Sequence, residues 1–443
     1  MLELLQAQFV SLIAGIGSSE GLTDLFLMLF PFFLLAELPL NLFILTGVIR
    51  WYLRQLSATP VSATYRPRVS CIITCYNEGR DVEKTLRTLC EQLYPGEIEL
   101  IPVVDGASIN QDTMQVVRDF QVDPRIHSRR FLRPIAKWQR GGRVSSLNAG
   151  LQAATGEIVF ALDGDTSFDN NVVSAMVRHF EDPNVPAVSG CLRVRNTWTS
   201  FTTAMQALEY FLSIHVSKVG LSEWNTVNNV SGAFGAFRRS FLVHIGGWDT
   251  HTAEDLDTTL RIKSYFGRRP LRIPFEPRAV AHTDVPTTLK SFFMQRLRWD
   301  GDLFFLYIRK HAHSMNPRMM GFPNFLMILA GGLFFQLVLP FLIVGYTVAG
   351  LILLSTEAIF FLFTLIYIVY LLVTVIFYVA GLLMVSDRPK EDLKFALLLP
   401  VFPLFMFLLR CWSVVCTLNE ILRRGHEETA MAPWWVLKRG KKF

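Results

Sequence analysis

The stretch FALDGDTSFD, residues 160–169, joins an apolar run to two closely spaced acidic residues. The segment VFAL before the first acid predicts the end of a buried strand, because short apolar runs bounded by turn residues are typical of a sheet core. Asp163 and Asp165 follow at alternate positions. Carboxylates placed there can hold Mg²⁺ or Mn²⁺ against the oxygens of a diphosphate. An ordinary turn with solvated carboxylates would show the same short pattern.

The chain around this stretch alternates between segments typical of strands and of helices. Apolar, β-branched runs predict strands, and the amphipathic runs between them predict helices. This alternation favours an α/β domain with a mostly parallel sheet that helices cover. The expected strands are residues 69–74, 98–104, 126–132 and 157–162, and the expected helices are residues 81–92, 112–121 and 143–154.

Five residues fall where these strands end. In open α/β sheets, ligands bind at the carboxyl ends of the strands. Tyr76 offers a flat face and Glu78 an acceptor, which suits the edge of a base, and Asp105 can accept from a base or a ribose. Asp163 and Asp165 complete the set. The sequence therefore predicts a nucleotide-binding edge.

A basic turn, RGGR at residues 140–143, precedes the helix expected from residue 143. A cation together with backbone N–H groups at a helix N-terminus makes a phosphate site. The alternative is a solvated basic turn, which is common on protein surfaces.

Composition divides the chain into globular and membrane parts. Of the 443 residues, 51% are hydrophobic and 18% are charged, whereas soluble domains average about 25% charged residues. The apolar residues concentrate in residues 25–49 and 322–422. The net charge of +6 is small and scattered, which argues against a nucleic-acid partner. The six cysteines show no C-x-x-C spacing, which indicates reduced thiols and fits a cytosolic catalytic domain.

Residues 25–49, 322–354 and 358–386 are long enough to cross a bilayer, which takes about 20 residues. Arginines directly after residue 49 place that end in the cytoplasm. Two prolines and an arginine interrupt residues 395–422. This last segment could be a kinked span, a re-entrant hairpin or an interfacial helix. Three simple spans after a cytosolic domain would place the C-terminus outside the cell, whereas the basic residues after this segment favour a C-terminus inside it, and we favour the inside.

Glu37 lies near the middle of the first expected span. A carboxylate at that depth is costly and normally faces a bundle interior or a wet cavity. Glu37 is either a packed, hydrogen-bonded or protonated residue, or it lines a polar path. Arg410 is a second candidate for lining that path and a candidate partner of Glu37.

The expected organisation has five parts. No basic n-region or A-x-A site precedes the first span, so no cleaved signal peptide is expected. The parts are an N-terminal membrane segment (1–54), a cytosolic catalytic domain (66–286), interfacial helices (287–320), a C-terminal transmembrane region (321–424) and a basic tail (425–443).

A series of motifs gives the chain a family resemblance. In order they are YNE (76–78), DG (105–106), GGRVSSLNAG (141–150), DGD (163–165), SGAFGAFRRS (231–240), GGWD (246–249), AEDLDTTLR (253–261) and QRLRW (295–299). Together they resemble the membrane-embedded processive family-2 glycosyltransferases, which include cellulose, chitin, hyaluronan and poly-N-acetylglucosamine synthases. The resemblance implies a Rossmann-like GT-A catalytic domain inserted between transmembrane helices, with amphipathic interfacial helices.

The resemblance also implies roles for individual residues. Displacement at an anomeric carbon needs a base on one face and a stabilised diphosphate on the other. Asp255 would be the base and Glu254 its neighbour, while Asp257 would be helical scaffold. In the donor site, Asp165 would hold Mg²⁺ or Mn²⁺ and Asp163 would face the nucleotide.

The remaining implied contacts lie on both sides of the acids. Arg143, Gln295 and Arg298 would bind the donor and its diphosphate. Trp299 would form a platform for the acceptor sugar, and Ser231 and Gly232 would approach that acceptor.

The sequence departs from the family pattern at two positions near the acids. Arg143 replaces a common lysine, and Ala253 replaces the usual threonine of the Thr-Glu-Asp triplet. Asp300 and Asp302 could form a second metal site, although the expected site is already supplied.

Two functions remain open at this stage. One is a processive inverting β-glycosyltransferase that polymerises UDP-N-acetylglucosamine or UDP-glucose and passes the polysaccharide through its own helices. The other is a non-processive enzyme that glycosylates a membrane lipid. Both imply an integral protein of the cell membrane with a cytoplasmic catalytic domain, and homo-oligomerisation or secretion partners are undetermined.

Overall fold

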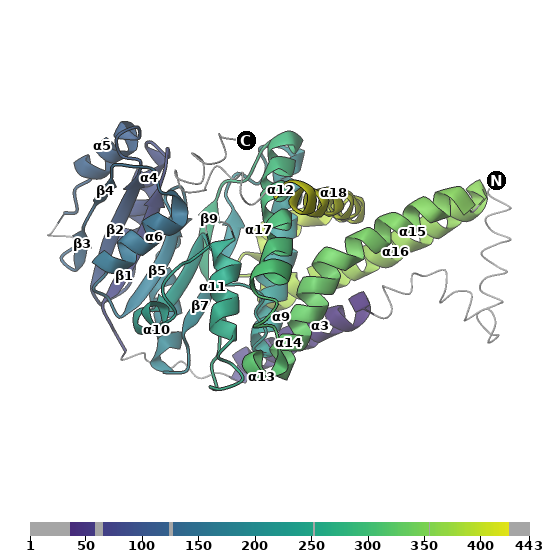
Figure 1. Ribbon diagram of the computed structural model, residues 1–443, viewed down its shortest axis with the longest axis horizontal. Helices are drawn as coiled ribbons and strands as arrows, with labels where there is room; N and C mark the ends of the chain where they lie inside the picture. Colours follow the sequence, from purple (N-terminus) through teal and green to yellow (C-terminus); the bar gives the residue numbers. More distant parts are fainter. Residues whose placement is uncertain (1–35, 58–64, 124–126, 251–252, 354, 425–443) are drawn as a thin grey trace.

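The computed structural model describes residues 36–57, 65–123, 127–250, 253–353 and 355–424. Residues 25–35 of the first expected span and the expected basic tail lie outside these ranges. An α/β domain occupies one end of the molecule, and two long helices, α15 (Leu339–Leu353) and α16 (Thr356–Ala380), project from the other end (Figure 1).

A single mixed sheet of nine strands organises the described part of the α/β domain. Its strand order is β3-β2-β1-β5-β8-β7-β9-β6, and β4 also pairs with β2. The strands are β1 (Val69–Cys75), β2 (Ile98–Asp105), β3 (Arg130–Leu132), β4 (Ile135–Lys137), β5 (Ile158–Asp163), β6 (Ser167–Phe168), β7 (Ala187–Val194), β8 (Phe234–Arg238) and β9 (Phe275–Thr283).

The parallel half of the sheet matches the expectation from sequence. Strands β2, β1 and β5 run parallel, and every residue of β1 and β2 is buried. Continuous apolar runs suit strands that helices cover on both faces. The other half differs, because β8 pairs antiparallel with β5 and with β7. The sheet is therefore mixed, and its second half was not predicted.

Helices pack around this sheet. Helix α6 contacts β1 and β2, whereas α8 contacts β7, and α7 and α9 contact β9. A π-helical segment, η3, connects α8 to α9. The helical segments are α4 (Asp81–Cys90), α5 (Gln111–Asp119), α6 (Gly142–Ala153), α7 (Val172–Val177), α8 (Phe201–Tyr210), η3 (Phe211–Val216), α9 (Ser217–Glu223), α10 (Arg239–His244) and α11 (Glu254–Lys263).

The helix α12 (Leu289–Phe304) carries the QRLRW motif without interruption and continues into the π-helix η4 (Phe305–Lys310). The sequence predicts two helices here, residues 287–294 and 303–308, on either side of the motif. Gly301 lies inside α12, where this helix packs along the helix Phe402–Arg423, and a Cβ there would meet the Cys416 carbonyl oxygen at an ordinary contact distance of 3.5 Å.

Three described helices are long and apolar enough to cross a membrane: Phe322–Ile352, Thr356–Val385 and Phe402–Arg423. The last is α18, a continuous helix that begins after the 3₁₀ turn η7 (Leu393–Leu398). Pro403 lies in the first turn of α18, where the missing N–H costs nothing, so it starts the helix instead of kinking it. We call residues 386–401, which include α17 (Pro389–Asp392), the connector.

Candidate active site

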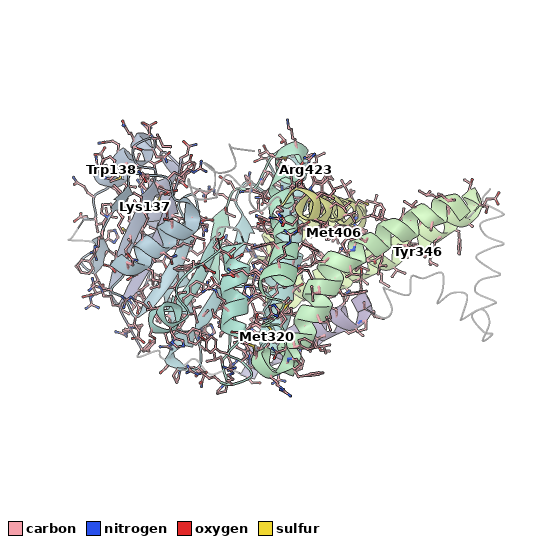
Figure 2. The ribbon with its side chains drawn as sticks, in the orientation of Figure 1. Lys137, Trp138, Met320, Tyr346, Met406 and Arg423 are labelled. Atoms are coloured by element: carbon pink, nitrogen blue, oxygen red, sulfur yellow. The ribbon has the colours of Figure 1, made fainter. Side chains whose placement is uncertain are left out.

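The parallel strands bring the predicted nucleotide-binding residues to one edge of the sheet. Thr74 pairs with Asp163, and Cys75 pairs with Val104. Because β1, β2 and β5 run in the same direction, the loops after them begin at the same edge. Figure 2 shows Lys137, the last residue of β4, and Trp138 after it at the end of the molecule opposite Tyr346 on α15.

Arg143 joins the two halves of the site. Its side chain is 11% exposed. It donates to Thr74 Oγ1 at 2.8 Å and to the Gly232 carbonyl at 2.6 Å. It also pairs with Glu254 Oε1 at 2.5 Å and with Asp163. A guanidinium carries five N–H donors in a fixed fork, so one side chain can hold all these groups at once.

The two adjacent acids at the start of α11 lie in different surroundings. Glu254 is buried, and burial raises its pKa, although Arg143 acts in the opposite direction. Asp255 is only half-buried. Its carboxylate accepts from Asn229 Nδ2 at 2.9 Å and from the Gly232 N–H at 3.3 Å. A general base must be reachable by the proton it takes, and Asp255 is the less buried of the two acids.

Gly232 makes room for both acids. A Cβ on this residue would stand 3.0 Å from Glu254 Oε1 and 3.4 Å from Asp255 Cβ. The backbone N–H of the neighbouring Ser231 donates to Ser189 Oγ at 3.4 Å, which anchors this loop to β7. Both residues predicted to approach the acceptor therefore lie beside the predicted base.

Asp165 is the acidic residue best suited to a metal. Asp163 is paired with Arg143, whereas the Asp165 carboxylate forms no ion pair within the described ranges. No group of three or more His, Cys, Asp or Glu side chains in the described part of the chain could hold a metal ion. Mg²⁺ in phosphate sites takes one or two carboxylates and completes its shell with phosphate oxygens and water. The donor set at Asp165 fits such an ion.

The base-binding candidates lie next to this loop. Glu78 Oε2 is buried without a hydrogen-bond partner among the described residues. Burial raises the pKa of Glu78, and the nearby Asp165 adds to that rise. Tyr76 is 39% exposed, and the Arg140 guanidinium lies 4.3 Å from its ring centroid. An orphan acceptor beside an aromatic ring suits a planar base with N–H donors.

Asp105 has more internal contacts than expected. It is 4% exposed, and it accepts from Lys137 Nζ at 2.7 Å and from the N–H groups of Gly141 at 2.9 Å and Gly142 at 2.8 Å. Both carboxylate oxygens are thus used to hold the basic turn and the start of α6. These contacts hold the basic turn beside the nucleotide edge, and the contact of Asp105 with base or ribose stays a prediction.

The QRLRW motif lies along α12. Gln295 Oε1 is buried with no hydrogen-bond partner in the described ranges, and Trp299 is 41% exposed. The Arg296 guanidinium lies 5.0 Å from the Trp299 ring centroid and pairs with Glu209 at 2.5 Å. Arg298 is partly buried on the same helix. The orphan amide oxygen and the exposed indole are both available to a ligand.

Sequence reasoning missed residues that support the predicted base. Lys218 is 4% exposed and donates to the Asn229 carbonyl at 2.9 Å, and Asn229 in turn contacts Asp255. Burial lowers the pKa of Lys218 to about 8, and the Asp255 charge opposes that shift. Burial raises the pKa of Tyr307 on η4, and Asp255 raises it further. The only signal for Lys218 was a single cation in an apolar run.

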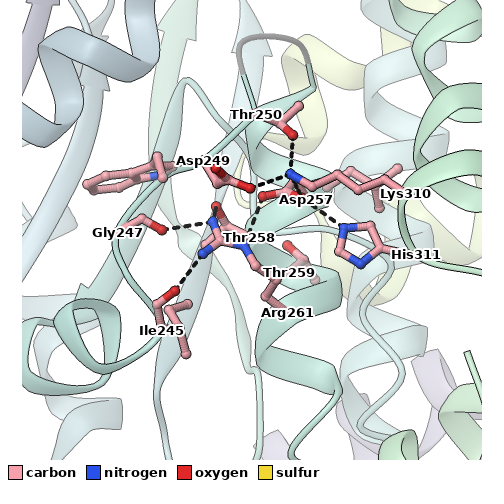
Figure 3. Close-up of polar contacts among 12 residues, drawn as sticks. Ile245, Gly247, Asp249, Thr250, Asp257, Thr258, Thr259, Arg261, Lys310 and His311 are labelled. Atoms are coloured by element: carbon pink, nitrogen blue, oxygen red, sulfur yellow. Dashed lines mark hydrogen bonds and ion pairs between the residues drawn. The ribbon is translucent and has the colours of Figure 1, made fainter. Parts of the chain in front are cut away.

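Asp257 fixes α11 against η4 and the GGWD loop (Figure 3). Its buried carboxylate pairs with Arg261 at 2.9 Å, with Lys310 at 2.8 Å and with His311 at 2.8 Å. Lys310 also pairs with Asp249 at 2.7 Å. These contacts agree with the scaffold role predicted for Asp257.

The fold and the acids at its strand ends define a GT-A glycosyltransferase. A solved mannosyltransferase, PcManGT from Pyrobaculum calidifontis in complex with GDP-Man and Mn²⁺, superposes with a TM-score of 0.53 and covers 86% of this chain and 99% of its own, at 21% identity. The model of the family described as glycosyltransferase like family 2 matches residues 67–301. The chain belongs to this family.

Among curated proteins, the poly-beta-1,6-N-acetyl-D-glucosamine synthase of Staphylococcus epidermidis is 32% identical over 233 residues. The Staphylococcus aureus protein of the same name is 30% identical over 233 residues. The matched region is 52% of this chain and 53% of either relative, so the chain matches these proteins over about half their length. The predicted family and GT-A fold are confirmed.

Proposed function

We propose that the chain is a processive inverting β-hexosyltransferase that polymerises N-acetylglucosamine from UDP-N-acetylglucosamine. The observation that carries the proposal is the cluster centred on Arg143, which holds the DGD stretch, Gly232 and the start of α11 in one site. The names of the staphylococcal relatives favour N-acetylglucosamine over glucose as the transferred sugar.

The chemistry follows from the positions of the acids. Asp255 takes the proton from an acceptor hydroxyl, and that oxygen bonds to the anomeric carbon as the bond to the diphosphate breaks. Bond formation and bond cleavage on opposite faces invert the configuration. A divalent ion at Asp165 would supply charge neutralisation for the leaving UDP. Trp299 supports the acceptor sugar, and Gln295 and Arg298 approach the diphosphate.

We extend the proposal to the path by which the polymer crosses the membrane helices. Glu37, which directly precedes α3 (Leu38–Ser57), lies near Arg410 on α18 and hydrogen-bonds Tyr370 on α16. Polar groups of this kind inside an apolar bundle mark paths for polar solutes. We place the catalytic domain in the cytoplasm and the exit of the polymer on the far side of the bilayer.

A donor screen tests the proposal. Full-length protein in lipid is given UDP-N-acetylglucosamine, UDP-glucose and GDP-mannose with Mg²⁺ or Mn²⁺, and UDP or GDP release is measured. The proposal expects the fastest release from UDP-N-acetylglucosamine. Faster turnover of UDP-glucose or of GDP-mannose would overturn the assigned donor.

A further inference from the structure

A cavity of about 400 Å³ lies outside the predicted transfer site, between the α/β domain and the connector. Ligand sites commonly have volumes of about 300–1,000 Å³. Residues from β7, α8, η3 and the connector line the cavity, and none of the residues predicted to bind donor, metal or acceptor does. The cavity adjoins the loop that contains Asp165, because Arg195 lines the cavity and donates to the Asp165 carbonyl at 3.2 Å.

One wall of the cavity is aromatic. Trp198 is 54% exposed, and its ring lies 6.0 Å from that of Phe395 on the connector. Phe211 also lies 6.0 Å from Phe395, and Tyr210 completes this wall. Phe395, Phe211 and Tyr210 are buried, whereas the exposed Trp198 ring offers a flat apolar surface of the kind on which sugar rings stack.

The cavity lining also includes hydrogen-bonding atoms that lack partners in the described part of the chain, and one of these residues, His215, packs edge-on against Phe211 with ring centroids 5.8 Å apart. His215 is 1% exposed, and neither of its ring nitrogens has a hydrogen-bond partner among the described residues. Arg193 Nε is also buried and unpartnered within that part of the chain. Burial lowers the pKa of His215 to about 3, so the ring is neutral and presents one donor and one acceptor. His215 lies in the π-helix η3, a type of interruption frequent at functional sites.

The arginines that line the cavity are already neutralised. Arg193 pairs with Asp392 at 2.9 Å and with Asp387 at 2.7 Å. Arg195 pairs with Asp284 at 2.6 Å, and Arg388 pairs with Asp169 at 2.6 Å. Lys394 and Glu391, which also line the cavity, have opposite charges. The cavity therefore suits a neutral ligand with several hydroxyl or amide groups better than an anion.

We propose that this cavity is a second saccharide-binding site, which takes a neutral N-acetylhexosamine unit of the acceptor or product between Trp198 and His215. The identity of the saccharide rests on the proposed function. A bound sugar would contact the α/β domain and the connector at once, and would therefore link the transfer site to the ends of two apolar helices.

Binding in a Trp299→Ala background tests the proposal, because that change removes the predicted acceptor platform. The probe is the β-1,6-linked disaccharide of N-acetylglucosamine, titrated calorimetrically into full-length protein in lipid nanodiscs. Residual binding is expected. Adding Trp198→Ala or His215→Leu should weaken it about tenfold or more, as expected when a central contact is truncated. Adding Phe131→Ala, which removes a 42% exposed ring on β3 at the sheet edge, should leave it unchanged.

Two results would overturn the cavity assignment: no binding in the Trp299→Ala protein, or residual binding that survives Trp198→Ala. Because the Trp198 ring is exposed, Trp198→Ala is expected to fold, and this variant tests the cavity even if His215→Leu fails to fold. Displacement of the disaccharide by inorganic phosphate would contradict the neutral character of the site. UDP release by the protein with Trp299 intact separates the two proposals. Turnover of UDP-N-acetylglucosamine by that protein, without residual binding in the Trp299→Ala protein, rejects only the cavity. Residual binding in the Trp299→Ala protein, without turnover by the protein with Trp299 intact, rejects only the proposed function.

Discussion

At the scale of single residues, the Arg143 side chain has the largest number of hydrogen-bonding partners among the predicted donor-site side chains described above. Its guanidinium reaches Thr74, Asp163, Gly232 and Glu254, which belong to four different segments. A lysine, common in the family at this position, has three donors on one nitrogen and cannot reproduce a planar fork. The contacts of the predicted site therefore depend on an arginine at this position.

We expect Arg143→Lys to lower the rate of UDP release about tenfold or more. Each lost charge-assisted hydrogen bond costs about 1.5–3 kcal/mol, and about 1.4 kcal/mol corresponds to a tenfold change in rate. Steady-state UDP release measures the effect. The matched control is Arg87→Lys on the exposed face of α4, where Arg87 forms an i,i+4 ion pair with Glu83. Equal rates for the two variants would contradict the central role of Arg143.

The predicted base gives a second residue-scale test. Asp255→Asn keeps the shape of the side chain but cannot take a proton, so we expect turnover to fall by about 10²–10⁴-fold. UDP binding should change little, because Asp255 contacts Asn229 and Gly232 rather than the nucleotide edge. Asp119→Asn on the exposed face of α5 serves as the control. Near-normal turnover by the Asp255 variant would remove it as the base.

At the scale of elements, the Asp257 cluster holds α11 in place beside η4. Burial alone would raise the pKa of Asp257, but the hydrogen bond from His311 and the charges of Arg261 and Lys310 lower it to about 2. Breaking such a buried pair commonly costs about 3–5 kcal/mol. We expect Asp257→Asn to lower the thermal unfolding midpoint clearly, whereas Glu83→Gln on exposed α4 should not.

The same shift predicts a pH dependence. The pKa of Asp257 is lower in the folded state, at about 2, than in the unfolded chain, at about 3.9. Its ion pairs therefore stabilise the fold fully above pH 4, and this stabilisation, about 2–3 kcal/mol, is lost as the pH falls from about 4 to about 2. Wild-type protein should lose more stability in this window than Asp257→Asn. A parallel decline of both proteins in thermal melts would contradict the assignment.

Local patterns predicted the elements in the first half of the domain. Strands β1, β2 and β5 are short apolar runs, and each lies within a residue or so of its expected limits. The antiparallel half was missed, because the pairing of β8 with β5 and β7 depends on contacts between distant segments. The two helices expected on either side of the QRLRW motif form one continuous helix, α12, which packs along α18 over much of its length.

The residues of the predicted site could likewise be recognised from the sequence only where they stand in motifs. Asp163, Asp165, Glu254 and Asp255 stand in motifs and could be recognised from the sequence. The role of Lys218 could not, because its contact with Asn229 forms only when α9 packs beside the loop before β8. The many contacts of Asp105 also depend on the folded basic turn.

At the scale of the whole molecule, charged residues tie the helices together. Glu37 is 4% exposed and lies beside Tyr370 and Arg410. Arg410 also donates to the Phe335 carbonyl at 2.8 Å. The sequence suggested a Glu37–Arg410 pair, but it could not show that four helical segments meet there.

Charge reversal tests this pairing. Glu37→Arg and Arg410→Glu should each reduce the yield of folded, membrane-inserted protein, because each leaves like charges together in an apolar bundle. The double variant should recover much of that yield. Size-exclusion profiles of detergent extracts report the outcome, and a double variant no better than either single one would show that the residues act independently.

Ion pairs between distant parts of the sequence hold the connector against the α/β domain, and no local sequence pattern predicts them. Arg193 on β7 reaches Asp387 and Asp392 almost two hundred positions later, and Arg388 reaches Asp169 at the end of the DGDTSFD stretch. The same stretch that places the predicted metal ligand thus also anchors the segment between two apolar helices.

The length and linkage of the product test the central proposal most directly. Purified full-length protein in lipid is incubated with UDP-N-acetylglucosamine and a divalent metal, and the product is separated by size and digested with linkage-specific hydrolases. The account predicts a ladder extending to long polymer that a β-1,6-specific N-acetylglucosaminidase degrades. A lipid carrying a single sugar as the sole product would contradict it.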